Sequence, residues 1–117
     1  MKMTTIYHNP RCSKSRETLA LLESNKIEAD VRLYLEDTPS VDELKVLLTQ
    51  LDITPIQLMR TKEAIYKENN LHLDSVTDEE RLVAMTQFPK LIERPIVIHN
   101  EKAKIGRPPE QVLELFK

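Results

Sequence analysis

The stretch that decides the fold is TTIYHNPRCSKSR, residues 4–16. Its first part, residues 4–8, is β-branched and aromatic and stops at Asn9-Pro10, which predicts a short buried strand. From Ser13 to about Lys26, apolar residues recur near helical spacing, which predicts an amphipathic helix. Cys12 is therefore expected at the junction between a strand and a helix.

The pattern continues outward from that junction as an α/β chain. Residues 30–35 alternate between apolar and polar types, which predicts a second strand. A strand, a helix and a strand in this order form a βαβ unit, so we expect the two strands to be parallel and the crossover to be right-handed.

The rest of the chain divides into a helical block and a final ββα segment. Residues 40–93 show no convincing strand and have helix openings at Ser40, Thr54 and Thr77, with Leu82, Val83 and Met85 expected on the inner face of the third helix. After that block we expect a strand at 95–99, a hairpin partner at 102–105 and a last helix at 110–116.

Composition limits the class of protein. The 117 residues suit one domain, and a net charge of −2 gives no sign of a nucleic-acid or membrane surface. No stretch approaches the length of a signal-peptide core or a membrane span, so a soluble, cytoplasmic protein is expected. The one cysteine cannot form an internal disulfide, which agrees with a reducing compartment.

Cys12 is either a small buried packing residue or a reactive thiol. At a helix start, the free N–H groups of the first turn and the helix dipole place positive potential on its sulfur. Four nearby residues should lower the thiol pKa further: the cations Arg11, Lys14 and Arg16, and His8 at the end of the preceding strand. Ser15 completes a Cys-x-x-Ser arrangement, and its hydroxyl is expected to contact the thiolate or to satisfy the first helical turn.

Arginines could complete an oxyanion site, because planar guanidinium groups give paired hydrogen bonds to a tetrahedral anion. Arg94 and Arg107 flank the predicted hairpin and could reach one end of the sheet. Gly106, the only glycine, suggests a backbone position with φ > 0 or a close approach to a neighbour. Arg60 on its own is better interpreted as a surface charge. His72 and His99 lack metal-ligand spacing, so no metal site is predicted.

Several segments together resemble the glutaredoxin-coupled arsenate reductase family, in order and approximate spacing. They are Tyr7-His8-Asn9-Pro10, Cys12, Ser15-Arg16, Tyr34-Leu35-Glu36, Arg60, Arg94-Pro95-Ile96-Val97 and Arg107-Pro108. The resemblance implies a single domain, 1–117, with a thioredoxin-like core at 1–39 and 94–117, a mixed four-stranded sheet, and a helical insertion at 40–93. It also implies a cis Arg94-Pro95 bond.

The resemblance further implies an oxidoreductase of arsenic detoxification with a redox-active cysteine. Cys12 would attack arsenate, with His8 near the thiolate and Ser15 as a candidate donor to it. The oxyanion would lie among Arg60, Arg94 and Arg107. Glutathione would be the co-substrate and glutaredoxin the partner, with no tightly bound cofactor.

Two other functions remain open at this point. One is a non-catalytic regulator of the same fold that binds RNA polymerase and senses thiol stress; such proteins usually carry a second cysteine where this chain has Ser15. The other is a monothiol glutaredoxin-like module that holds an iron–sulfur cluster with glutathione, in which case Arg60, Arg94 and Arg107 would have no obvious role.

Overall fold

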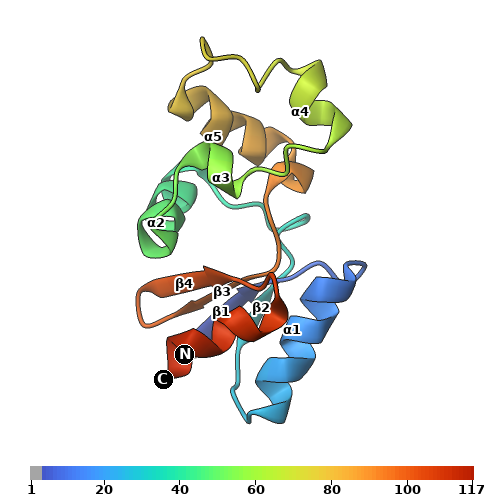
Figure 1. The fold of residues 1–117 in the computed structure, drawn as a ribbon, viewed down its shortest axis with the longest axis vertical. Coiled ribbons are helices and arrows are strands. Elements are labelled where there is room, and N and C mark those ends of the chain that lie inside the picture. The colour runs from blue at the N-terminus through green and yellow to red at the C-terminus, as the bar shows by residue number, and fades with distance from the viewer. Residues whose placement is uncertain (1–3) are drawn as a thin grey trace. The chain divides into compact units, whose positions relative to one another are not determined.

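A computed structural model describes residues 4–117 of the chain. These residues form two compact units: one runs up to Asp37 and resumes at Arg94–Lys117, and the other is Thr38–Glu93. The first unit carries a sheet with two helices, and the second is built from helices (Figure 1).

The sheet has four strands in the order β2-β1-β3-β4. Strand β1 (Thr4–Tyr7) pairs in parallel with β2 (Asp30–Arg32) and antiparallel with β3 (Ile96–His99), and β3 pairs antiparallel with β4 (Lys102–Ile105). The predicted mixed sheet, with its βαβ and ββα segments, is therefore confirmed.

Strand β2 is shorter than the predicted 30–35. The backbone N–H groups of Glu36 and Asp37 both donate to the Leu33 carbonyl, at 2.9 and 2.8 Å. This turn ends the extended segment before Tyr34. The apolar alternation continues through the turn because Tyr34 is buried and stacks on Tyr7, with ring centroids 6.3 Å apart.

One hydrophobic cluster holds the sheet to its two helices, α1 (Ser13–Ser24) and the 3₁₀ helix η2 (Pro109–Phe116). Its centre is the fully buried set Ile6, Leu22, Val97 and Val112. Burying side chains of this size contributes about 1.5–3 kcal/mol each. The last helix was predicted at 110–116 and is present, but as a 3₁₀ helix that begins at Pro109.

The second unit contains the three predicted helices and two short ones. The predicted helices are α2 (Val41–Leu51), α3 (Pro55–Leu58) and α5 (Asp78–Gln87); the others are α4 (Ala64–Glu68) and the 3₁₀ helix η1 (Pro89–Leu91). Reciprocal capping boxes open two of these helices, Ser40 with Glu43 at α2 and Thr77 with Glu80 at α5.

The face of α5 differs in part from the prediction. Leu82 and Met85 are buried as expected, whereas Val83 is 39% exposed and does not belong to the inner face. Arg81 takes an inner position instead: it is 8% exposed, and its guanidinium donates to the carbonyls of Leu71 and Leu73, at 3.1 and 3.0 Å. A buried charge is stable there because backbone acceptors satisfy it.

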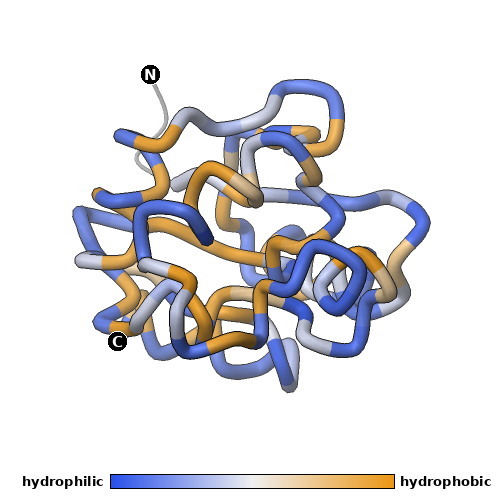
Figure 2. The backbone as a smooth tube through the Cα atoms, turned by 90° about the horizontal axis from the view of Figure 1, so that it is seen from above, coloured by the Kyte–Doolittle hydropathy of each residue, from blue (hydrophilic) through white to orange (hydrophobic). Residues whose placement is uncertain are grey.

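Hydrophobic and hydrophilic residues alternate along much of the backbone, as expected of a chain that buries one side of each element (Figure 2). Within residues 4–117, no helix has both the length and the apolar character that a membrane crossing requires.

Candidate active site

Cys12 is the N-cap residue of α1, directly after the turn that follows β1. Its own N–H donates to the Asn9 carbonyl at 3.0 Å, and the Asn9 side chain accepts from the N–H of Arg11 at 3.0 Å. Asn9 therefore shapes the turn through both its backbone and its side chain. The predicted position of Cys12, between a strand and a helix, is confirmed.

The pKa of the Cys12 thiol lies below its ordinary value. Burial acts in the opposite direction and raises it, because the side chain is only 8% exposed. The backbone N–H of Ser15, the charge of Arg94, the N–H of Lys14 and the charge of Arg107 together outweigh that effect and lower the pKa. The site therefore favours the thiolate, which is the nucleophilic form of cysteine.

The charges that act on the sulfur are not the ones nearest in sequence. Of the predicted local cations, Lys14 is paired with Glu17 at 3.6 Å and Arg16 donates to the Pro10 carbonyl at 2.9 Å. The side-chain charges of these two residues and of Arg11 are not among the causes that lower the thiol pKa, whereas the charges of Arg94 and Arg107 are, and Lys14 acts only through its backbone N–H. The expectation that neighbouring cations would tune Cys12 is corrected accordingly.

Arg107 is held beside the thiol by the backbone of Arg94, just before β3. Its Nη2 lies 3.8 Å from the Cys12 sulfur, and its Nε donates to the Arg94 carbonyl at 2.8 Å. The bond Arg94-Pro95 is cis, as predicted, and Arg107-Pro108 is also cis, which the sequence did not reveal.

Gly106 is required by a close approach rather than by a positive φ angle. A Cβ atom there would lie 2.7 Å from Oγ1 of Thr18 and 2.8 Å from Cγ of Pro95. The Gly106 N–H also donates to the Pro95 carbonyl at 2.9 Å. The backbone just before Arg107 is thus packed directly against α1, the helix that Cys12 begins.

His8 and Ser15 form a buried pair behind the thiol loop. The Nδ1 atom of His8 and the Oγ atom of Ser15 are 2.6 Å apart, and the same Oγ accepts from the N–H of Asn9 at 3.0 Å. The Ser15 hydroxyl contacts these two groups, and Ser15 acts on the sulfur through its backbone N–H. A bond from the hydroxyl to the thiolate stays a prediction.

The pKa of His8 is lowered, first by burial and then by the positive charge of Arg16. His8 is 6% exposed and is accordingly expected to be a neutral imidazole near pH 7. A neutral His8 adds no charge to the thiol, so its contribution is to hold Ser15 and the turn.

Arg60 lies in the helical unit, where its guanidinium contacts the carboxylates of Glu63 and Glu93. Its backbone N–H donates to the Leu91 carbonyl at 2.7 Å. A role at the oxyanion stays a prediction for this residue. Among residues 4–117, no group of three or more potential ligand side chains could hold a metal ion.

Two roles at this site were missed in the sequence. Asn9-Pro10 was identified as the end of the strand, but the Asn9 side chain was not expected to shape the turn. Thr18 is fully buried and donates to the Lys14 carbonyl at 2.8 Å. Its only signal was a polar residue on the inner face of an amphipathic helix.

Known proteins are similar to this chain over nearly its whole length. An arsenate reductase of Haemophilus influenzae is 52% identical over 112 residues, 95% of this chain and 97% of that protein. The Escherichia coli protein YfgD is 55% identical over 115 residues, 97% of each chain. A solved structure of an arsenate reductase from Vibrio cholerae superposes with a TM-score of 0.95 at 55% identity, covering 97% of this chain and 98% of that one.

The architecture is the thioredoxin-like fold predicted from the sequence, shared with these structures. The model of the ArsC family matches residues 7–115, which include the whole Cys12 loop and both arginines beside it. The chain therefore belongs to the ArsC family.

Proposed function

We propose that this chain reduces arsenate to arsenite in the cytoplasm, with glutathione and glutaredoxin as electron donors. The observation that carries the proposal is the lowered pKa of Cys12 beside Arg107, whose Nη2 is 3.8 Å from the sulfur. A thiolate supplies the nucleophile, and guanidinium groups bind a tetrahedral oxyanion. Relatives named arsenate reductase support arsenate as that oxyanion.

The proposed reaction begins when the Cys12 thiolate attacks arsenic and a hydroxide leaves as water. Glutathione then attacks the adduct, and formation of a Cys12–glutathione disulfide transfers two electrons to arsenic as arsenite departs. The thiolate of glutaredoxin attacks the glutathione sulfur and releases Cys12. Arg94 and Arg107 would offset charge on the oxyanion during attack, with Arg60 proposed as a third ligand.

The proposal of an external donor rests on the count of sulfur atoms. Cys12 is the only cysteine of the chain, and neither Ser13 nor Ser15 can form a disulfide. A chain without a second thiol has no internal disulfide to present to thioredoxin, so a free thiol must resolve the adduct.

The test is an assay coupled to NADPH oxidation. Arsenate-dependent oxidation is expected with glutathione, glutathione reductase and glutaredoxin, and little or none with thioredoxin and its reductase alone. Cys12→Ser should abolish the rate, whereas Ser13→Ala, which leaves the sulfur in place, should retain it. Equal rates from the thioredoxin system without glutathione would exclude the proposed donor.

A further inference from the structure

The two edges of the sheet differ in how they are protected. The outer strand β4 carries exposed lysines at positions 102 and 104, the type of residue that discourages pairing with another chain. The other outer strand, β2, has Val31 at its centre, and this side chain is 47% exposed. Of the two edges, β2 is therefore the one with an exposed apolar residue at its centre, between Asp30 and Arg32.

Val31 directs its backbone groups away from the sheet. The Arg32 carbonyl accepts from the N–H of His8 at 2.9 Å, so the groups of Arg32 face β1. Because backbone groups alternate in direction along a strand in a parallel ladder, the N–H and C=O of Val31 face outward. One residue with both groups outward can exchange two hydrogen bonds with an antiparallel neighbour.

The sequence of β2 is complementary to itself. When the β2 strands of two copies pair antiparallel about Val31, Asp30 of the first copy lies opposite Arg32 of the second. By symmetry, Arg32 of the first copy lies opposite Asp30 of the second. The Asp30 carboxylate has no ion pair or side-chain hydrogen bond within residues 4–117. Arg32 already pairs with the Asp37 carboxylate of its own chain at 3.4 Å, so the partner's Asp30 would be a second carboxylate beside it. Opposite charges across such a pair are stabilising, and a two-fold axis repeats the contact.

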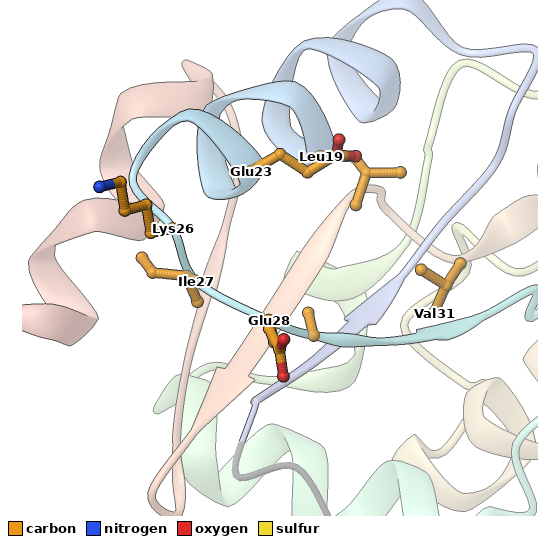
Figure 3. A pocket seen from close by; sticks show the side chains of 7 residues that line it. Leu19, Glu23, Lys26, Ile27, Glu28 and Val31 are labelled. Atoms are coloured by element: carbon orange, nitrogen blue, oxygen red, sulfur yellow. The ribbon is translucent and has the colours of Figure 1, made fainter.

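A depression lies beside this edge, on the side of the sheet covered by α1 (Figure 3). It has a volume of about 440 Å³, and its apolar lining is formed by Leu19, Ile27, Ala29 and Val31. In the register centred on Val31, Leu33 of the neighbouring strand lies opposite Ala29 and on the same face, because side chains alternate along a strand. Leu33 is 38% exposed, so the chain offers both a depression and a side chain to enter it.

We propose that two copies of this chain associate through β2, pairing antiparallel about Val31, with Leu33 of each copy in the depression beside α1 of the other. The sheet then continues from one copy into the next through a two-fold axis. The contact is small, so the dimer is weak and forms at high protein concentration. This association is separate from the reduction chemistry and holds or fails independently of it.

Cross-linking tests the register. Opposite residues of a hydrogen-bonded antiparallel pair have Cα atoms about 5.5 Å apart, within the range that a disulfide spans. In a Cys12→Ser background, Val31→Cys should form a covalent dimer when oxidised glutathione is the oxidant. Lys104→Cys on β4, in the same background, is the matched control and should remain mostly monomeric. Equal or faster cross-linking of the control would overturn the proposal.

Sedimentation velocity over a range of concentrations tests the complementarity. Asp30→Lys and Leu33→Ser should each raise the dimer dissociation constant at least tenfold. The controls are Asp74→Lys, another exposed acid, and Val46→Ser, another exposed apolar residue, and both should behave as wild type. A wild type that stays monomeric at the highest concentration, or controls that weaken the dimer equally, would refute the β2 contact.

Discussion

The guanidinium of Arg107 lies 3.8 Å from the sulfur of Cys12, although 95 residues separate the two in sequence. The antiparallel pairing of β1 with β3 brings these ends of the chain together, because β1 leads into Cys12 and β3 begins beside Arg94. The Arg94 carbonyl then orients Arg107. The charge environment of the thiol is therefore a property of the folded sheet.

Replacing Arg107 should raise the thiol pKa, whereas replacing Arg11 should not. Arg107→Ala removes a cation that lowers the pKa of Cys12, and Arg11 is not among the groups that do so. Arg11→Ala is a matched control, because it removes an exposed arginine next to Cys12 in sequence. The measurement is the rate of iodoacetamide labelling against pH, and equal shifts in both variants would contradict the assignment.

The wild-type labelling profile should show its inflection below about 8.5, the ordinary value for a thiol. The folded state binds this proton less tightly than the unfolded chain, so the thiolate stabilises the fold above the unfolded pKa. This contribution is lost as the pH falls through the folded pKa. Urea unfolding of wild type and Cys12→Ser at several pH values measures this contribution. The stability of wild type relative to Cys12→Ser should rise as the pH rises and fall as the pH falls through the folded pKa.

Lysine at position 94 or 107 should lower kcat/KM for arsenate at least tenfold, which corresponds to about 1.4 kcal/mol of transition-state stabilisation. Lysine keeps the charge but loses the planar fork that gives paired hydrogen bonds. Circular dichroism should show an intact fold in Arg94→Lys and Arg107→Lys. Wild-type kinetics in both variants would exclude an oxyanion clamp.

Ser15→Ala should destabilise the protein by about 1–3 kcal/mol, the usual cost of leaving buried polar groups without a partner. The change removes the hydroxyl that lies 2.6 Å from Nδ1 of His8 and accepts from Asn9. The Cys12 pKa should change little, because the backbone N–H of Ser15 remains. Chemical denaturation measures the stability, with the exposed Ser13→Ala as control. A large rise in the thiol pKa would instead indicate a direct bond from the hydroxyl to the sulfur.

Gly106→Ala should cost about 1–3 kcal/mol of stability, the range seen when extra atoms enter a packed region. The new methyl group would overlap Thr18 and Pro95. Thr18→Ala removes one of these neighbours, so the double variant should be less destabilised than the sum of the two single changes. Thermal or urea unfolding of wild type, both single variants and the double variant measures this coupling. Strict additivity would show that contact with Thr18 does not cause the destabilisation by the new methyl group.

Much of the fold follows from local patterns, and much of the site does not. Strand β1, helix α1 and the capped helices α2 and α5 are predictable because their periodicity and caps lie within a few residues. The end of β2 is not, because the turn onto Leu33 occurs together with the stacking of Tyr34 on Tyr7, a residue far away in the sequence. Local sequence cannot distinguish a strand that ends at Arg32 from one that continues to residue 35.

The site likewise depends on residues that are far apart in the sequence. Cys12 could be placed at a helix start, but the charges beside it come from Arg94 and Arg107 rather than from its sequence neighbours. The hydroxyl of Ser15 was expected at the thiol or in the first helical turn, and it lies 2.6 Å from Nδ1 of His8, the residue after β1. Both outcomes depend on distances between elements, and these are set only when the sheet forms.

The strand pairing also determines where extra chain can be inserted. Strands β2 and β3 flank β1, one parallel and the other antiparallel to it, so β2 ends and β3 begins at the same end of the sheet. Residues 38–93 therefore leave and rejoin the sheet at one end. Because the entropy of closing a loop rises only with the logarithm of its length, doubling such a segment costs about 0.6 kcal/mol. Segments of quite different length could replace this one at little thermodynamic cost, while the register of the four strands stays the same.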